Sequence, residues 1–109
     1  MRRSPTPESQ VLHAILDYLA AVRILAFRQN VGIATFGVEG ATRHVPYGVL
    51  GMADIVAFPK NRPVLWIEVK TAKGIQSDLQ KSFQRQVEEY GHEYLIVRSI
   101  DDLEAWLNR

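Results

Sequence analysis

The chain places acidic side chains in two short segments that otherwise have the composition of buried β-strands. One segment is Trp66-Ile67-Glu68-Val69-Lys70, and the other is Ile55-Val56-Ala57-Phe58, which Asp54 directly precedes. Strands buried on both faces have near-continuous apolar sequences, and these segments match that pattern apart from Asp54, Glu68 and Lys70. Desolvating an unpaired charge is expensive. The fold must therefore give each of these charges a partner or a metal ion.

The residues between the two segments predict a β-hairpin with a defined register. With residues 59–63 as the turn, Val56 faces Trp66 and Asp54 faces Glu68. Directly opposed residues share one face of a sheet, with Cβ atoms about 5 Å apart. Two carboxylates placed in this way repel each other, and a divalent cation between them removes the repulsion.

This face suits metal-assisted phosphodiester hydrolysis, which needs a cation, an activated water and a group that orients the water. Hard cations such as Mg²⁺ take oxygen ligands. Asp54 and Glu68 are the candidate ligands, together with the backbone carbonyl of Val69. Lys70 has the same strand parity as Glu68 and is the candidate donor to the water or the phosphate. The alternative is an ion-paired cluster in which Lys70 only neutralises one acid.

The remaining segments predict an α/β fold in one domain over residues 1–109, with a mixed sheet and helices packed on it. Its order is α-β-(loops)-β-β-α-β-α. Before the hairpin, the sequence predicts a helix from Pro7 to about Val22 capped by Thr6, a strand from Ile24 to Phe27, and an irregular hairpin with loops between Asn30 and Gly51. After it, the sequence predicts a helix from the capping box at Ser77 to Tyr90 with Gly91 as its C-cap, a strand from Tyr94 to Val97, and a last helix that Ser99 caps and that runs through Leu107.

Four further residues are candidate site residues, and each has a structural alternative. Glu8 lies on the inward apolar stripe of its helix and can reach a metal at the end of the sheet, although a carboxylate is favourable in any first helical turn. Gln80 either completes the capping box or extends toward the site. Gly51 permits close backbone approach, either to a substrate or to a neighbouring strand. Lys73 either contacts a phosphate or is simply solvated.

Composition excludes several other classes of protein. The 109 residues contain no cysteine, which excludes disulfides and thiolate metal sites, and the three histidines show no ligand spacing for zinc. No apolar run reaches the roughly 18 residues of a membrane span, so we expect no membrane association and a cytoplasmic location. The net charge of +1 does not by itself indicate a nucleic-acid partner.

The candidate residues belong to a longer pattern that covers nearly the whole chain. Its members are Glu8, Arg28-Gln29-Asn30-Val31-Gly32, Gly51-Met52-Ala53-Asp54, Ile67-Glu68-Val69-Lys70, Gln80 and Tyr94-Leu95-Ile96-Val97-Arg98-Ser99. Together they resemble a VRR-NUC domain, a family of the PD-(D/E)XK nuclease superfamily. Ala53 stands where that family usually has proline, which rigidifies the backbone before the aspartate but supplies no chemistry.

The resemblance implies a restriction-endonuclease-like fold, in which a mixed β-sheet is flanked by helices, and an endonuclease that needs Mg²⁺ or Mn²⁺. It implies branched DNA as substrate, with four-way junctions preferred, and a homodimer of the stand-alone phage or bacterial type in the cytoplasm of a bacterial or phage-infected host cell. The residues at its active-site positions are Glu8, Asp54, Glu68, Lys70 and Gln80, and those expected to contact substrate are Arg28, Asn30, Gly51 and Lys73. Two alternatives remain open: a catalytically silent nucleic-acid-binding module of the same fold, and a nuclease acting on RNA or linear single strands.

Overall fold

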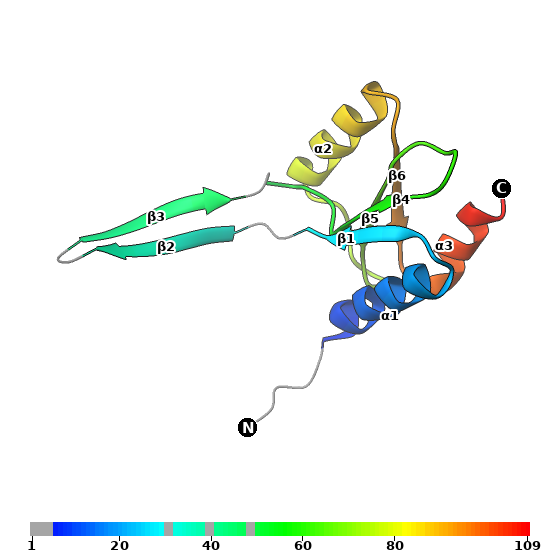
Figure 1. The fold of residues 1–109 in the computed structure, drawn as a ribbon, viewed down its shortest axis with the longest axis horizontal. Helices are drawn as coiled ribbons and strands as arrows, with labels where there is room; N and C mark the ends of the chain where they lie inside the picture. Colours follow the sequence, from blue (N-terminus) through cyan, green and yellow to red (C-terminus); the bar gives the residue numbers. More distant parts are fainter. Residues whose placement is uncertain (1–5, 30–31, 39–40, 48–49) are drawn as a thin grey trace.

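The structure is a computed structural model that describes residues 6–29, 32–38, 41–47 and 50–109. The described residues form three helices and six strands, which are labelled in Figure 1. In chain order they are α1 (Pro7–Ala21), β1 (Leu25–Arg28), β2 (Gly32–Val38), β3 (Ala41–Tyr47), β4 (Ile55–Phe58), β5 (Leu65–Val69), α2 (Asp78–Glu89), β6 (Glu93–Val97) and α3 (Ile100–Leu107). The predicted α/β order is confirmed, and β2 and β3 form the hairpin predicted between Asn30 and Gly51.

Four strands form one mixed sheet in the order β1-β4-β5-β6. β4 runs antiparallel to both β1 and β5, whereas β5 and β6 are parallel and are joined through α2. Val56 lies opposite Trp66, which is the register that a turn over residues 59–63 predicts. Because of these directions, the ends of β1, β5 and β6 and the start of β4 all meet at one edge of the sheet.

The two faces of this sheet are covered by different helices, with α1 and α3 on one side and α2 on the other (Figure 1). Alternate side chains of a strand point to opposite faces, so β5 contributes to both cores. The larger core is formed by Leu12, Ile15, Leu19, Ile55, Ala57, Leu65, Ile67, Val69, Val97, Leu103 and Trp106. On the α2 side, Phe83 packs edge-on against Trp66 with ring centroids 5.1 Å apart. Glu68 is two positions after Trp66 in β5, so both residues lie on the face of the sheet that α2 covers.

β2 and β3 form a separate two-stranded sheet in which Gly32 pairs with Tyr47 and Val38 with Ala41. The predicted hairpin between Asn30 and Gly51 is therefore confirmed, whereas its predicted irregularity is wrong, because both strands are regular over seven residues. An antiparallel ladder is made by backbone groups, so glycines in and around it weaken the pairing without preventing it. Figure 1 shows this hairpin extending away from the helices and the larger sheet.

The first two helices begin as the sequence predicts. The backbone N–H of Ser9 donates to the Thr6 hydroxyl at 3.1 Å, which caps α1. At α2, the side chains of Ser77 and Gln80 each accept a hydrogen bond from the other's backbone N–H, which is the predicted capping box. Of the helices that the structure describes, none is long and apolar enough to cross a membrane.

The last helix begins differently from the prediction. Ser99 occupies the N-cap position of α3, but its side chain makes no capping hydrogen bond. The carboxylate of Asp102 instead accepts a hydrogen bond of 2.8 Å from the backbone N–H of Arg98. This bond joins the first turn of α3 to the backbone that precedes its N-cap residue.

Candidate metal centre

Three acidic side chains meet at the edge of the sheet where β5 ends and β4 begins. Glu8 comes from the first turn of α1, Asp54 immediately precedes β4, and Glu68 lies within β5. Each contributes a carboxylate oxygen, and these three oxygens lie within 4.8 Å of one another. The sequence predicted all three as site residues, and the fold brings them together from segments far apart in the chain.

Two hydrogen bonds hold Asp54 at this edge. Its carboxylate oxygen Oδ2 accepts from the backbone N–H of Val69 at 2.8 Å, and its backbone carbonyl accepts from the N–H of Gln29 at 2.7 Å. The first bond ties Asp54 to the end of β5, and the second ties it to the segment that follows β1. The Asp54 carboxylate is therefore fixed beside Glu68. This agrees with the strand register, because Val56 pairs with Trp66 and the residues two positions further along, Asp54 and Glu68, then face each other.

Glu68 is the one buried charged residue in the part of the chain that the structure describes, with 2% of its surface exposed. Its carboxylate oxygen Oε2 has no hydrogen-bond partner. A buried acceptor left without a partner costs about 1–3 kcal/mol, and more when the group is charged. This oxygen therefore needs either a proton or a cation.

The surroundings of Glu68 favour its protonated form when no cation is bound. Burial, a hydrogen bond with the Asp54 carboxyl and the negative charge of Asp54 raise the pKa of Glu68 to about 9, with a smaller contribution from Glu8. The positive charge of Lys70 lowers this pKa but does not offset the rise. A divalent cation would reverse the balance, because it favours the charged form of every acid around it.

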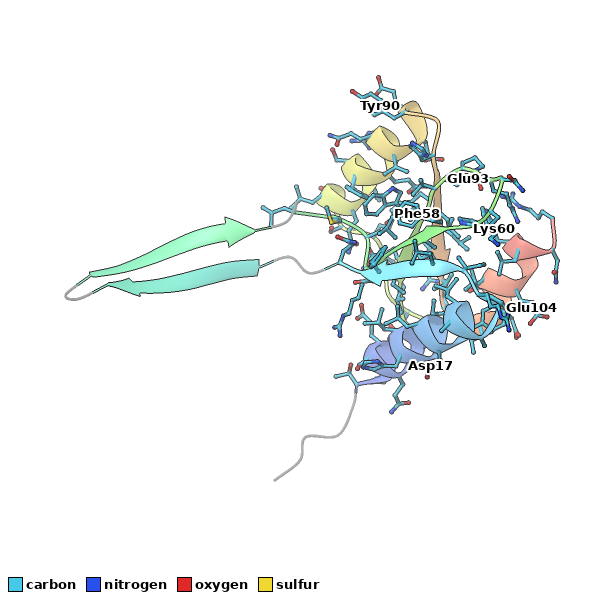
Figure 2. The ribbon with its side chains drawn as sticks, viewed as in Figure 1. Asp17, Phe58, Lys60, Tyr90, Glu93 and Glu104 are labelled. Carbon is cyan, nitrogen blue, oxygen red and sulfur yellow. The ribbon has the colours of Figure 1, made fainter. Side chains whose placement is uncertain are left out.

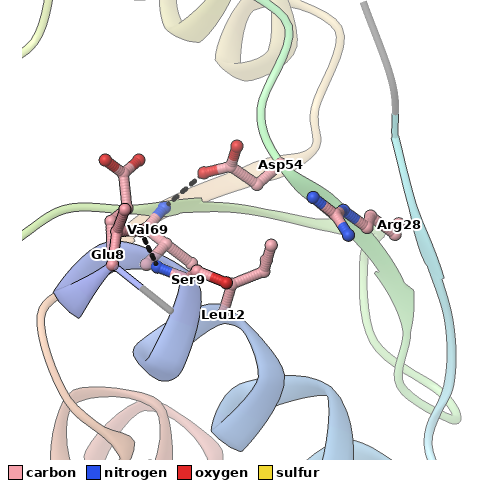
Figure 3. A pocket seen from close by; sticks show the side chains of 7 residues that line it. Glu8, Ser9, Leu12, Arg28, Asp54 and Val69 are labelled. Atoms are coloured by element: carbon pink, nitrogen blue, oxygen red, sulfur yellow. Dashed lines mark hydrogen bonds between the residues drawn. The ribbon is translucent and has the colours of Figure 1, made fainter. Parts of the chain in front are cut away.

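An open pocket of about 210 Å³ lies beside the acids and is lined by Thr6, Glu8, Ser9, Leu12, Arg28, Asp54 and Val69. Figure 3 shows Asp54 between Glu8 and Arg28 along this pocket, with its carboxylate bonded to the backbone of Val69. Since one water takes about 30 Å³ in the liquid, the pocket has room for a hydrated ion or a phosphate group.

The donor set fits a hard divalent cation. Mg²⁺ takes oxygen ligands at about 2.1 Å, so two ligands on one ion lie at most about 4.2 Å apart. Oxygens within 4.8 Å of one another reach this arrangement through small side-chain adjustments. Three carboxylates and no nitrogen or sulfur ligand favour Mg²⁺ or Mn²⁺ over zinc or copper.

Lys70 follows β5 directly, and its side chain is partly buried. Among the described residues, the ion pair within 4.0 Å is that of Arg109 with Glu93, so Lys70 forms no such contact with the acids. This geometry argues against an ion-paired cluster, in which the lysine would directly neutralise a carboxylate. The positive charge of Lys70 is still close enough to lower the pKa of Glu68. Because Lys70 forms no ion pair there, its ammonium group is available to a water or a phosphate near the acids.

The observed contacts of Gln80 and Gly51 are made at the start of α2. The side-chain oxygen of Gln80 accepts from the backbone of Ser77, so its observed contact is the capping box, and its catalytic role stays a prediction. Gly51 approaches the first turn of α2, where an added Cβ would lie 2.4 Å from the carbonyl oxygen of Leu79. That approach is to a helix and not to a strand, and contact of Gly51 with a substrate stays a prediction.

The other predicted contact residues lie around the pocket or beyond the described residues. Arg28 is the last residue of β1 and lines the pocket. Lys73 is exposed in the turn after β5. Asn30 lies outside the described residues. The backbone N–H of Val69 contacts Asp54, whereas coordination through its carbonyl stays a prediction.

Sequence reasoning missed a polar network on the α2 side of the sheet. The amide of Gln76 donates to the Gln84 side chain at 2.9 Å and to the Tyr94 hydroxyl at 3.3 Å. Burial raises the pKa of Tyr94 to about 12; Gln76 lowers it, and the charges of Glu68 and Asp54 raise it. Tyr94 therefore lies close enough to sense the acids. No spacing in the sequence connects these residues, because they come from a loop, a helix and a strand.

Comparison with known proteins adds no name to this site. No protein-family model matches the chain, and no curated protein matches it. The fold and the geometry of the acidic cluster therefore carry the functional argument.

Proposed function

We propose that the protein is a divalent-metal-dependent endonuclease that hydrolyses phosphodiester bonds in branched DNA, with four-way junctions preferred. The observation that carries this proposal is the meeting of Glu8, Asp54 and Glu68, in which a buried oxygen of Glu68 has no partner. This carboxyl is satisfied either by a proton shared with Asp54 or by a cation, and a cation would neutralise the repulsion among all three acids at once.

The roles of the residues follow from their positions. Asp54 and Glu68 hold the ion, with Glu8 and the Val69 carbonyl as further ligands, and Mg²⁺ or Mn²⁺ bound there supplies a positive charge beside the scissile phosphate. Lys70 donates to the attacking water or to the phosphate, because its charge acts on this site without being paired. Arg28 supplies a second positive charge at the pocket wall.

We further propose a restriction-endonuclease-like fold of the VRR-NUC type. A mixed four-stranded sheet with helices on both faces and acids at one edge of the central strands supports this assignment. Recognition of branched DNA would rest on contacts with phosphates and on the shape of the branch, and not on base edges.

A cleavage panel tests the proposal directly. Linear duplex, flap, fork, four-way junction, linear single strand and RNA are incubated with Mg²⁺ or Mn²⁺, and with a chelator as control. We expect metal-dependent cutting that is fastest on the junction and is abolished by Asp54→Asn or Glu68→Gln. Glu89→Gln removes an exposed acid of α2 and is the matched control, which should cut like the wild type.

Each of three other outcomes would contradict one part of the proposal. Binding of junctions without cutting of any substrate would indicate a silent binding module. Cutting of RNA or linear single strands in preference to junctions would change the substrate class and keep the metal chemistry. Cutting by Asp54→Asn at the wild-type rate under saturating Mg²⁺ would show that the assigned site is wrong.

A further inference from the structure

A short turn next to the acids carries the chain out of β5. The backbone N–H of Lys70 donates to the carbonyl of Val97 at 3.0 Å, which extends the pairing of β5 with β6 by one residue. The chain then turns over residues 71–74, and the N–H of Gly74 donates to the carbonyl of Thr71 at 3.1 Å. This segment, the 71–74 turn, therefore begins directly after Lys70.

The side chain of Arg98 joins the two ends of the 71–74 turn. One nitrogen of its guanidinium, Nη1, donates to the carbonyl of Gly74 at 2.9 Å and also to the carbonyl of Thr71. Arg98 is itself held in place, because its backbone N–H donates to Asp102 at 2.8 Å and the preceding residue of β6, Val97, is fully buried. The guanidinium thus links the residue that directly follows β6 to both ends of the turn.

The side chain of Lys70 lies beside this turn. A Cβ added to Gly74 would lie 3.4 Å from Cδ of Lys70 and 3.3 Å from the Thr71 hydroxyl, so the Lys70 side chain passes beside Gly74. The charge at the end of this stem acts on Glu68. Movement of the turn would therefore move the ammonium group of Lys70 relative to Glu68.

Arg98 is poorly placed for a large role in overall stability. It is exposed, and within the described part of the chain it pairs with no acid at ion-pair distance. Its hydrogen bonds to the turn are exposed, so water competes with them for both partners. A displacement of about 1 Å in a catalytic group, in contrast, can reduce a rate by about 100-fold.

We propose that Arg98 is a positioning residue: its guanidinium fixes the 71–74 turn and, through this turn, the Lys70 side chain at the acidic cluster. The inference rests on the proposed nuclease function, in which Lys70 acts on the attacking water or the phosphate. It assigns to Arg98 no contact with the substrate.

The test compares Arg98→Ala and Arg98→Lys with Arg85→Ala, which removes an exposed arginine of α2 and is the matched control. We expect Arg98→Ala to lower kcat on the junction by about 10- to 100-fold, less than the full contribution of a general acid–base group, with KM and Mn²⁺ affinity unchanged. Arg98→Lys keeps the charge but cannot hold both carbonyls as rigidly, so its kcat should also fall. Arg85→Ala should cut like the wild type.

A double-mutant cycle with Lys70→Ala separates positioning from an independent role. If Arg98 acts through Lys70, Arg98→Ala causes no further loss in single-turnover rate once Lys70 is absent. Multiplicative losses would overturn the proposal. A rise in KM that steepens with salt would also overturn it, because that pattern indicates a phosphate contact. Full activity of Arg98→Lys beside an inactive Arg98→Ala would show that charge and not the clamp matters.

A second readout does not depend on cleavage. Hydrogen exchange at the Gly74 amide should be faster in Arg98→Ala than in the wild type, and the side-chain NMR resonances of Lys70 should shift, with neither change in Arg85→Ala. If the wild type cuts no substrate, the proposed function fails while these changes still support the link from Arg98 to Lys70. If the wild type cuts and both readouts are unchanged in Arg98→Ala, the inference alone fails.

Discussion

At the scale of single residues, Glu68 is the most informative side chain of the protein. It is an acid in the middle of a buried strand, and its free oxygen faces other acids instead of a donor. Selection for stability alone would favour an apolar residue at this position, because the desolvation penalty of a buried charge can exceed the free energy gained from its electrostatic interactions. The cost is explained if the position serves a bound cation.

The raised pKa of Glu68 predicts how stability changes with pH in a chelator. Its pKa of about 9 in the folded protein lies above the ordinary value of 4.5, so the folded state binds the proton more tightly than the unfolded state. The stability contributed by this proton is fully present below pH 4.5 and is lost as pH rises through 9. We expect the unfolding temperature measured in EDTA to decrease as the pH is raised from 5 to 9. In Glu68→Gln this decrease should be smaller.

Saturating Mg²⁺ should also flatten it, because the cation stabilises the ionised carboxylate and raises stability at high pH. Glu89→Gln again serves as the control and should keep the wild-type slope. A slope that is the same in wild type and Glu68→Gln would contradict the assignment of this titration to Glu68.

At the scale of elements, the site depends on contacts that fix α1 and α2 against the sheet edge. Glu8 reaches the acids because Thr6 sets the start of α1 and Leu12, Ile15 and Leu19 are buried against the sheet. On the other face, Gly51 lets the backbone before Asp54 touch the first turn of α2.

Glu8→Gln tests whether the first turn of α1 serves the site or only its own helix. The helix-dipole contact of Glu8 is worth about 0.3–1 kcal/mol, so stability should change little. Loss of a group that supports a metal site typically costs about 10- to 100-fold, and we expect a loss of cleavage in that range. A clear drop in the melting temperature with unchanged cleavage would instead indicate a purely structural role.

Two glycines with similar backbone angles offer a matched test of the contact with α2. Gly51 and Gly91 have φ of +83° and +85°, but an added Cβ meets the Leu79 carbonyl at 2.4 Å only at Gly51 and meets nothing within 4 Å at Gly91. Gly91→Ala should cost about 1–2 kcal/mol of backbone strain, and Gly51→Ala about 1–3 kcal/mol more through overpacking. Equal losses in denaturant unfolding would argue against the close contact.

The strand pair that carries the acids could be predicted from sequence because its turn has a fixed length. A turn over residues 59–63 and the two-residue period of strands left one register, and the observed pairing of Val56 with Trp66 agrees with it. The capping residues Thr6 and Ser77 were equally predictable, since they act through residues only three positions away.

The parts that could not be predicted depend on distant or competing partners. The Ser99 side chain makes no cap, Asp102 bonds to the Arg98 backbone instead, and the regularity of the β2–β3 hairpin was obscured by its glycines. The bond of Asp54 to the Val69 backbone and the clamp of Arg98 on the 71–74 turn join residues that no local spacing relates.

At the scale of the whole molecule, the described residues bring together one group of three acids that could hold a metal ion. A symmetric four-way junction must be cut on two strands, and a two-fold pair of identical sites supplies two cuts related by the same symmetry. We therefore expect a homodimer that prefers junctions over linear duplex, with an affinity that falls steeply as salt rises. Sedimentation that gives only monomer at micromolar concentration, together with equal cutting of linear and branched DNA, would contradict this assembly and leave the metal site untouched.

The most direct test of the central claim is a calorimetric titration of the protein with Mn²⁺ at neutral pH. We predict binding of the ion by the wild type and by Lys70→Ala, because lysine does not coordinate a cation, and loss of binding in Asp54→Asn and in Glu68→Gln. Circular dichroism should show that all four proteins are folded. Mn²⁺ binding by a folded Glu68→Gln with the wild-type affinity would contradict the claim that Glu8, Asp54 and Glu68 form a metal centre.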